Sequence, residues 1–383
     1  MIKVGRSVFV LQALLIGVSL LEQVSPNVVL KTTLQSDQNN ILISPFLMAE
    51  GLTQLFLGAE GQTAEELKFV IPFFNGNNNS DINEYIQEDR NQIRSKALKY
   101  GNSLFVAKDV DIFASYDEKI RQIFNTDVMK VNFGDSSKTV SEINDWVAKQ
   151  TDYKIREIVQ ETSEDIKIML VSAIYFKGFW QYPFEVSNTQ KRVFYLPQEN
   201  GKSEDTILVD TMAREGEYKY RFLKYLDADA IDLPYAESNI SMVIIKPRKV
   251  NGIEKLMADL NNVSIHTLFE DRFLETVKLF LPKFKFEYSV NLKEMLQSIG
   301  IHELFQSANL KSMTDFGSPL YVSDVIQKGF ISVDEEGTTA SAVQEINIHA
   351  RHAIDVFEVN HPFIFYIKDN KRIYFAGQVN NPL

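Results

Sequence analysis

The sequence predicts an α+β protein, in which helices and long sheet strands occur along one chain. Three stretches carry this prediction. Residues Ser141–Val159 have the apolar spacing of an amphipathic helix followed by a turn. Lys167–Glu185 begins, just after its lysine, with the uninterrupted apolar run IMLVSAIYF, which is typical of a strand buried on both faces. Val277–Tyr288 alternates by twos, as expected for a strand with one buried face.

The length and composition predict one large domain with a sizeable core. The chain has 383 residues, of which 45% are hydrophobic, and no Pro/Gly/Ser-rich linker divides it. A net charge of −11 without a basic stripe argues against a nucleic acid or polyanion partner, because phosphate contacts require clustered Lys and Arg. The absence of cysteine excludes disulfides, thiol catalysis and thiolate metal sites.

Residues 1–19 are predicted to be a secretory signal peptide. A positively charged start precedes the apolar stretch Ser7–Leu21, which has the length of a signal-peptide core. This stretch is shorter than the roughly 20 apolar residues that span a membrane, so we expect no membrane association. Small residues favour cleavage after Ser19, which leaves 20–383 as one secreted, extracellular domain. A retained apolar helix is the alternative.

Three Asn-x-Ser sequons support a secretory route. The candidate glycosylation sites are Asn78, Asn239 and Asn262. Asn78 lies in the asparagine-rich stretch FNGNNNSD, which has the composition of a loop, so we expect it to be the most exposed of the three.

The remaining elements follow in chain order. Asn40–Leu67 predicts a short strand, a proline turn and an apolar helix. A second helix is expected to start near Thr63, because Thr63 to Glu66 fits a capping box. Ala228–Pro247 predicts two strands around a turn, and Asn291–Phe305 returns to helical spacing.

The sequence contains near misses to catalytic motifs but no complete one. His302 begins a match to a zinc-protease helix, but Gln306 stands where the second metal ligand is required. Residues Gly201–Ser203 end like a phosphate loop, yet Leu196 replaces the first glycine that such a loop needs. There is no Gly-x-Ser-x-Gly elbow. We therefore expect a protein that is not an enzyme and that uses neither a metal nor another cofactor.

The stretch Glu335–Pro362 has the composition of an element with two states. It opens with two acids and a glycine, and Thr338 to Val343 are all small residues without proline or charge. Isoleucines and polar residues then alternate, as in a half-buried strand. Such a stretch can be an exposed loop in one state and an inserted strand in another, whereas the alternative is a plain linker.

This stretch resembles the hinge and reactive-centre loop of the serpins, and other motifs agree with that resemblance. The flanks VSDVIQKGFISVDEEG and FEVNHPFIFYIKDNKRIYFAGQVNNP, the segment NILISPF and the run LVSAIYFKGFWQYPFE resemble family motifs in the same order. The likeness extends from about Asn40 to Leu383. It implies the serpin fold, with large mixed β-sheets, a helical shell and an exposed reactive-centre loop at about 335–361.

The resemblance also implies a mechanism. In this family a protease cleaves the loop, the loop inserts into the main sheet, and the acyl-enzyme is trapped. Family spacing from Gly337 and from Pro362 places the reactive bond between Arg351 and His352, and an arginine there fits the buried carboxylate in the pocket of a trypsin-like protease. The implied hinge comprises Glu335, Gly337, Thr338, Thr339, Ala340, Ser341 and Ala342.

The leading expectation is therefore a monomeric suicide inhibitor that forms a covalent acyl-enzyme complex with a trypsin-like serine protease. The alternative is a non-inhibitory serpin that acts as a carrier or interaction protein. The histidines around the reactive bond are either exposed loop residues without a special role or pH-sensitive contacts to the protease. They are His349, His352 and His361.

The chain departs from the family pattern beneath the centre of the main sheet. The family's serine, asparagine and histidine correspond here to Leu47, Ser172 and Gln327. Ser172 and Gln327 are able to hydrogen-bond each other, whereas the Leu47 side chain cannot join them. The sequence leaves open whether this thinner polar network loosens or tightens the strands that must part for insertion.

Overall fold

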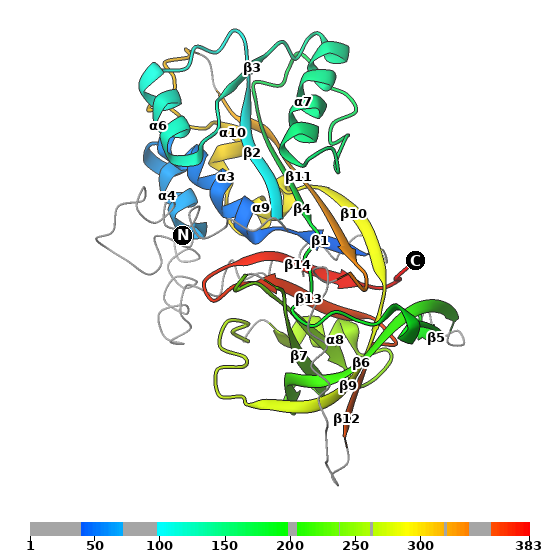
Figure 1. The fold of residues 1–383 in the computed structure, drawn as a ribbon. Coiled ribbons are helices and arrows are strands. Elements are labelled where there is room, and N and C mark those ends of the chain that lie inside the picture. The colour runs from blue at the N-terminus through cyan, green and yellow to red at the C-terminus, as the bar shows by residue number, and fades with distance from the viewer. Residues whose placement is uncertain are drawn as a thin grey trace, which may run out of the picture.

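The chain forms two β-sheets with helices packed around them in the computed structural model, which confirms the predicted α+β class (Figure 1). The structure describes residues 40–71, 98–197, 205–236, 238–260, 263–317, 320–336 and 354–383. The predicted signal peptide, the sequons at Asn78 and Asn262, the hinge from Gly337 onward and the bond between Arg351 and His352 lie outside the described residues.

The first sheet has five strands in the order β10-β11-β4-β2-β3. Their bounds are Phe284–Asn291 for β10, Val322–Val333 for β11, Ile168–Phe176 for β4, Leu98–Ala107 for β2 and Met129–Val131 for β3. β4 and β11 pair in parallel, with Gln327 opposite Ser172, while β10 pairs antiparallel with β11. β4 is buried at every position except Tyr175, which is half-buried, as its apolar run predicts.

The second sheet has nine strands. Eight of them follow the order β1-β14-β13-β8-β7-β6-β9-β12, and the ninth, β5, pairs with β6. Their bounds are Ile41–Ile43 for β1, Gln190–Tyr195 for β5, Thr206–Leu223 for β6, Ala228–Pro234 for β7, Ser241–Pro247 for β8, Leu274–Pro282 for β9, Asp355–Glu358 for β12, Phe363–Lys368 for β13 and Ile373–Val379 for β14. β7 and β8 are the two strands that Ala228–Pro247 predicts.

The predicted strand Val277–Tyr288 is divided between the two sheets. β9 ends at Pro282 and β10 begins at Phe284, so the chain changes sheets at Lys283. The Lys283 backbone N–H donates to the Asp210 carbonyl at 2.8 Å. The apolar positions shift by one residue at this junction, from Val277, Leu279 and Leu281 to Phe284, Phe286 and Tyr288. The prediction of one strand overlooked this shift, and the structure has two strands.

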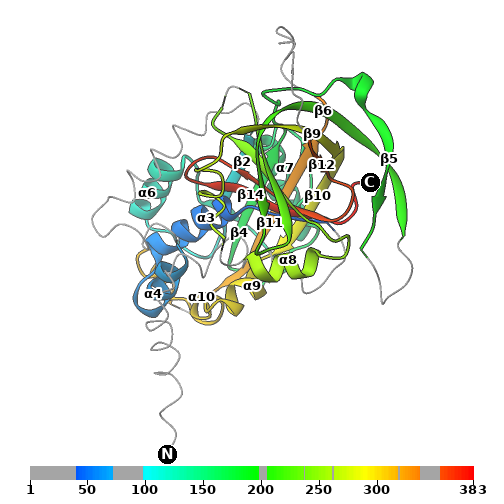
Figure 2. The ribbon, with the colours of Figure 1, turned by 90° about the horizontal axis from the view of Figure 1, so that it is seen from below.

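The helices cover the five-stranded sheet and the ends of the second sheet (Figures 1 and 2). Their bounds are Pro45–Gly58 for α3, Gly61–Val70 for α4, Ala114–Phe124 for α6, Ser136–Gln150 for α7, Ile253–Asp259 for α8, Lys293–Ser298 for α9 and Glu303–Gln306 for α10, with a short 3-10 helix, η3, at Val186–Asn188. Figure 2 shows α4, α9 and α10 on one side of the molecule and β5 at the opposite edge.

Three helix boundaries differ from the sequence expectations. The capping-box prediction is wrong, because α4 begins at Gly61 and Thr63 is buried inside it, where its hydroxyl accepts the Asn309 N–H at 3.0 Å. α7 begins at Ser136, earlier than the predicted Ser141, and the predicted turn follows its end at Gln150. The predicted helix at 291–305 is two short helices, separated near Gly300, whose φ of 105° suits a residue without a side chain.

The two sheets share a core at the end of β4. Phe176 on β4, Phe365 on β13 and Phe375 on β14 are fully buried in one cluster. The rings of Phe176 and Phe375 lie 6.0 Å apart in an edge-to-face arrangement. This packing fixes the end of β4 against the second sheet, close to the place where β11 also ends.

Candidate functional site

The candidate site lies between the end of β11 and the start of β12. β11 belongs to the five-stranded sheet and β12 to the nine-stranded sheet, so the chain between them joins two different sheets. We call 337–353 the reactive segment, Asp334–Glu336 its N-terminal anchor and Asp355–His361 its C-terminal anchor. The junction between β4 and β11 is called the seam.

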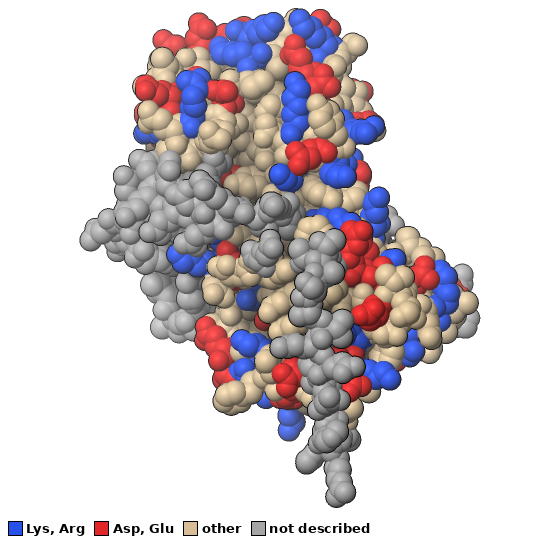
Figure 3. All heavy atoms as spheres, in the orientation of Figure 1, with Lys and Arg blue, Asp and Glu red and all other residues tan. Residues whose placement is uncertain are grey.

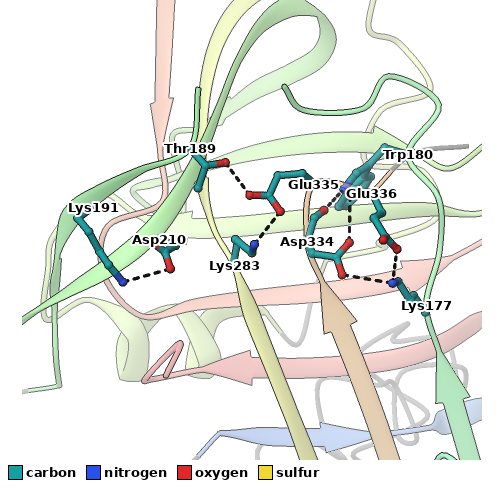
Figure 4. A network of polar contacts seen from close by, with 9 residues as sticks. All are labelled: Lys177, Trp180, Thr189, Lys191, Asp210, Lys283, Asp334, Glu335 and Glu336. Carbon is teal, nitrogen blue, oxygen red and sulfur yellow. Dashed lines mark hydrogen bonds and ion pairs between the residues drawn. The ribbon is translucent and has the colours of Figure 1, made fainter. Parts of the chain in front are cut away.

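The N-terminal anchor is held by side chains of the loop that follows β4 (Figure 4). The Trp180 indole N–H donates to the Asp334 carbonyl at 2.9 Å. The Lys177 ammonium lies 3.4 Å from the Asp334 carboxylate and also binds Glu336. Lys177 follows β4 directly, while the two acids follow β11. These contacts therefore hold the C-terminal ends of both strands together.

Glu335 has the most enclosed carboxylate of this anchor, with 8% of the residue exposed. The Thr189 hydroxyl donates to its Oε1 at 2.7 Å, and the Lys283 ammonium lies 2.7 Å from its Oε2 (Figure 4). Burial alone would raise the pKa of this carboxyl, but the hydrogen bonds from Lys283 and Thr189 outweigh it and lower the pKa below its ordinary value. Glu335 is therefore ionised at neutral pH.

Trp180 is positioned by an aromatic stack that requires a glycine. The rings of Trp180 and Tyr235 are stacked 4.5 Å apart with 12° between their planes. A Cβ on Gly178 would lie 2.4 Å from the Tyr235 ring, so a side chain at 178 would displace this ring. The sequence motif around Lys177, Gly178 and Trp180 pointed to this place, whereas Thr189, Lys283 and Tyr235 belong to no recognisable motif.

The seam below the anchor is closed. β4 and β11 are direct neighbours, and their parallel pairing extends to Phe176 opposite Ile331. On the seam, the rings of Tyr175 and Phe330 lie 5.2 Å apart. The Lys328 ammonium donates to the Glu157 carbonyl at 2.8 Å and pairs with Glu287 at 2.9 Å, which ties the segment after α7 to β11 and β10.

The polar groups beneath the seam form two separate sets, which corrects the expectation that Ser172 and Gln327 bond each other. The Gln327 side chain makes two bonds to the Ser44 backbone, accepting the N–H at 2.6 Å and donating to the carbonyl at 3.0 Å. The Ser172 hydroxyl donates to Asn102 Oδ1 at 3.0 Å, and Asn102 Nδ2 donates to the Leu47 carbonyl at 2.8 Å. Leu47 thus contributes through its backbone, and Asn102 is the polar residue that sequence reasoning missed.

The C-terminal anchor is a strand rather than a set of side-chain contacts. β12 pairs in parallel with β9, and Phe357 is 1% exposed in the core. Backbone bonds continue past the strand, from the Val359 N–H to the Phe280 carbonyl at 2.9 Å and from the Tyr195 N–H to the Asn360 carbonyl at 2.8 Å. This end of the reactive segment is therefore fixed to the nine-stranded sheet by its backbone.

A partly exposed ion pair and a buried histidine complete this anchor. The Arg192 guanidinium donates twice to Glu358, at 3.0 and 2.6 Å, and lies 4.1 Å from the Phe280 ring centre. His361 is 2% exposed, with Nε2 donating to the Pro247 carbonyl at 2.7 Å. Burial, followed by the charge of Lys246, lowers the pKa of His361 to about 4. The expectation of an exposed loop histidine is thus wrong for His361.

Other predicted features can be placed only in part. Asn239 is exposed in the connection between β7 and β8, where an attached glycan would meet solvent. Among the described residues, the structure contains no grouping of His, Asp and Glu suited to a metal ion, and none of the helices it describes is long and apolar enough to cross a membrane. Figure 3 shows basic and acidic side chains interspersed over the described residues of the face that it presents.

Comparison with known proteins gives the family. A family model described as Serpin (serine protease inhibitor) matches residues 22–382. The chain is 31% identical over 350 residues to Serine protease inhibitor 42Dd of Drosophila melanogaster, covering 90% of this chain and 91% of that protein. It is also 31% identical over 347 residues to Antichymotrypsin-2 of Bombyx mori, covering 88% and 91% of the two chains.

A solved structure agrees with the sequence comparison. The structure of Serpin48, described as a highly specific serpin in the insect Tenebrio molitor, superposes with a TM-score of 0.81 at 28% identity and covers 94% of this chain and 97% of that chain. The chain therefore belongs to the serpin family of serine protease inhibitors and has the serpin fold. Its class of function is protease inhibition, and it is not an enzyme.

Proposed function

We propose that this serpin is a secreted, monomeric suicide inhibitor of a trypsin-like serine protease. The protease cleaves between Arg351 and His352, and the hinge then inserts into the seam while the acyl-enzyme is still attached. Serine protease and inhibitor are thus consumed together in one covalent complex.

The observation that carries this proposal is the parallel pairing of β4 and β11 directly below the N-terminal anchor. A strand that turns back from the end of β11 runs antiparallel to β11, and it also runs antiparallel to β4 because the two strands are parallel. Insertion would replace one parallel ladder with two antiparallel ladders, which adds backbone hydrogen bonds. That gain is a source of free energy for trapping the enzyme.

The composition of the hinge suits this inserted position. α3 packs so closely under β4 that a Cβ on Gly51 would lie 2.6 Å from a Leu170 side-chain carbon. An inserted strand would pack its inward-facing side chains against α3, where there is little space for large groups. An unpaired charge in that position would lose its solvation. The run from Thr338 to Ala342 contains small, uncharged residues.

Arg351 supports the trypsin-like specificity. It is the one Lys or Arg between Thr338 and Val359. A guanidinium forms paired, charge-assisted hydrogen bonds with the carboxylate of a trypsin-like pocket, and a pocket left without this partner keeps an unpaired charge. Overall sequence similarity does not identify the target protease, because the similar Bombyx mori protein, Antichymotrypsin-2, is named for chymotrypsin.

The direct test is to mix the protein with trypsin and look for a complex that survives SDS. We expect such a complex, with a new N-terminus at His352 by mass spectrometry of the cleaved inhibitor. Arg351→Ala should lower the association rate by orders of magnitude, because the pocket carboxylate loses its partner. Thr338→Arg should be cleaved at the same bond without a complex, because an inserted strand would bury its charge.

Two results would overturn the proposal. Cleavage of the parent protein after Arg351 without an SDS-stable complex would favour the carrier or interaction protein. Trypsin inhibition by Arg351→Ala at the parent rate would remove Arg351 from its role.

The secretory part of the proposal rests on the predicted signal peptide and the sequons. Expression of the full chain in a secreting eukaryotic cell should yield a product that begins at Leu20, runs as a monomer on size exclusion and shifts in mass on treatment with an N-glycosidase. Asn239→Gln should remove part of that shift. A product that stays inside the cell and still carries residues 1–19 would contradict this route.

A further inference from the structure

Four side chains form a row across the seam, just below the N-terminal anchor. Tyr175 on β4 and Phe330 on β11 are direct partners in the parallel ladder, and their ring centres lie 5.2 Å apart. We call these two residues the cross-seam pair. The Lys154 ammonium lies 5.9 Å from the centre of the Tyr175 ring, and the Lys285 ammonium lies 5.3 Å from the centre of the Phe330 ring.

The cross-seam pair lies on the face of the sheet opposite α3. Side chains alternate between the two faces of a strand, and those of Ser172 and Gln327 form their hydrogen bonds on the side of α3. Tyr175 and Phe330 each follow three residues later, so their side chains point to the other face. Phe330 is 8% exposed and Tyr175 is half-buried, so the two rings are largely shielded from water.

The connection from α7 to β4 crosses the seam at this level. Asp152 pairs with Lys99 on β2 at 3.3 Å, and the Glu157 carbonyl accepts the Lys328 ammonium of β11 at 2.8 Å. Lys154 lies between these two contacts in the sequence and brings its ammonium to the ring on β4. Because the connection is bound on both sides of Lys154, this ammonium is held close to the cross-seam pair.

The lysines of the row interact with aromatic rings rather than with acids. Neither Lys154 nor Lys285 forms an ion pair with any residue that the structure describes. The negative face of an aromatic ring attracts an ammonium group, and two rings in a tilted contact attract each other beyond the area that they bury. The row therefore joins β4 to β11 through side chains, in addition to the backbone ladder.

Insertion of the hinge must separate the cross-seam pair. Neighbouring strands lie about 4.8 Å apart, so a strand that enters between β4 and β11 moves them to about 10 Å. Rings whose centres now lie 5.2 Å apart would then lose contact. Tyr175 lies two residues before Lys177, and Phe330 lies four residues before Asp334. On this face, the pair is thus the first aromatic contact that a strand entering from the anchor meets.

We propose that the cross-seam pair sets the rate at which the hinge enters the seam, and that Lys154 and Lys285 hold its two rings in place. This inference rests on the proposed function and adds a control step to it. After cleavage, the ester between the protease serine and Arg351 either reacts with water, which frees the enzyme and leaves a carboxylate on Arg351, or is trapped by insertion. A tighter pair slows insertion and lets more protease escape.

The first test measures opening of the seam without a protease, by hydrogen exchange of residues 168–176 at pH 7. Tyr175→Val and Phe330→Val each remove one ring and should raise the exchange rate about fivefold, since contact between two aromatic rings contributes on this scale. The double variant should exchange more slowly than the product of the two single effects, because each ring alone has no partner. Additive effects would assign the rings to separate packing and overturn the pair.

Conservative variants distinguish the ring contact from general packing. Tyr175→Phe keeps the ring and should match the parent. Lys285→Met keeps most of the side-chain volume but removes the cation, so it should raise the exchange rate about twofold, whereas Lys285→Arg should not. If Phe330→Val does not fold, Tyr175→Val and Lys285→Met decide the outcome, and parent-like exchange in both would overturn the pair.

The second test follows insertion during the reaction with trypsin. The chain has no cysteine, so Val343→Cys gives one site for a fluorescent dye in every variant. In a strand that buries Thr338, Ala340 and Ala342, residue 343 points outward, so the dye stays out of the core. At saturating trypsin, the dye signal should change about fivefold faster in Tyr175→Val. The number of inhibitor molecules consumed per trapped enzyme should fall or stay at one.

The matched control is Phe305→Val. Phe305 is 6% exposed and has the Lys293 ammonium 5.8 Å from its ring centre, but it lies on α10 and not at the seam. Its removal should lower the urea midpoint as the other ring removals do, without changing the exchange of residues 168–176 or the rate of the dye signal. Equal changes in this control and in Tyr175→Val would indicate general destabilisation and would overturn the inference.

The outcomes separate this inference from the proposed function. If the labelled parent is cleaved by trypsin but forms no SDS-stable complex, the proposed function fails, and control of insertion fails with it. If the parent forms the complex but Tyr175→Val opens the seam without faster insertion, the proposed function stands and the cross-seam pair does not control it. If Tyr175→Val changes neither exchange nor insertion, the pair does not hold the seam closed.

Discussion

The two anchors of the reactive segment are built from different kinds of interaction. The N-terminal anchor depends on side chains: the Lys177, Asp334 and Glu336 side chains are 29%, 26% and 63% exposed. The C-terminal anchor depends on a strand ladder, on backbone bonds that continue past it and on the buried Phe357 ring. Each anchor also has a carboxylate with a basic partner: the Glu335 side chain is 9% exposed and the Glu358 side chain is 33% exposed.

This difference shows which end is suited to release. Exposed ion pairs contribute about 0–1 kcal/mol each, so most contacts of the N-terminal anchor exchange with water at little cost. A buried aromatic side chain contributes several times more, and a paired strand cannot leave without exposing its backbone groups. A segment held in this way can detach and move at its N-terminal end while its C-terminal end stays on the second sheet.

The largest expected effect comes from Phe357→Ala, which removes the core of the C-terminal anchor. Phe357 is 1% exposed, and truncation of such a ring costs about 3–5 kcal/mol. Urea unfolding followed by fluorescence should show a correspondingly lower midpoint. Val356→Ala, on the same strand but 58% exposed, is the control and should change stability by less than about 0.5 kcal/mol. Equal effects of the two substitutions would mean that the strand is not anchored by burial.

The second prediction concerns pH. His361 has its pKa lowered to about 4 and stays neutral in the fold, whereas the unfolded chain binds a proton near pH 6.5. The unfolded state therefore gains stability as pH falls from about 6.5 to about 4, which destabilises the fold by about 3 kcal/mol over this range. Hydrogen exchange of residues 354–361 at pH 7 and pH 5, corrected for the intrinsic rate, should show weaker protection at pH 5.

His361→Gln is the control for this pH effect. Glutamine does not titrate, so the variant should lack the pH dependence between 6.5 and 5 that the parent shows. At the N-terminal anchor, Glu335 has a lowered pKa, and its contribution is present at neutral pH and lost only as pH falls through that lowered value, below about 4.5. Mild acid should thus weaken the C-terminal anchor first, and the reverse order would contradict both assignments.

A smaller effect is expected from Glu335→Gln at the N-terminal anchor. The amide keeps the shape and can still accept from Thr189, but it loses the charge that pairs with Lys283 at 2.7 Å. Opening of residues 334–336 should become easier by about 1–2 kcal/mol, the scale of a hydrogen bond to a charged group. Limited proteolysis near 334–336 should accelerate about tenfold, while the protection of β12 should stay unchanged. A change at both anchors would show that they do not open independently.

The smallest effect is expected from Lys177→Met. Its ion pairs with Asp334 and Glu336 are partly exposed, so their loss should cost less than about 1 kcal/mol, and less in high salt. The same measurement on Trp180→Phe should give a larger loss, because that ring is 3% exposed and its N–H bonds the Asp334 carbonyl. A larger effect of Lys177→Met than of Glu335→Gln on the opening of residues 334–336 would mean that the exposed ion pairs, and not Glu335, stabilise the N-terminal anchor.

The sequence by itself determined the α+β class, the serpin identity and the direct neighbours of its motifs. The apolar run IMLVSAIYF became the buried strand β4, and the motif around Lys177 and Trp180 marked the loop that holds the N-terminal anchor. These features were readable because burial on both faces and short local motifs leave their signal within a few residues of chain. The same locality explains why Ala228–Pro247 predicted both β7 and β8.

Only the tertiary structure decided which distant groups meet. Lys283 and Thr189 bind Glu335 from 52 and 146 positions away, and Asn102 joins Ser172 to the Leu47 backbone across 70 and 55 positions. The change of sheet at Lys283 leaves only a one-residue shift in the apolar positions, which does not say which sheet each strand joins. The burial of His361 leaves no signal in the spacing, because histidine is a polar residue type. Periodicity records which face of an element is apolar, whereas partners across the fold depend on how the elements pack, and that information is spread over the whole chain.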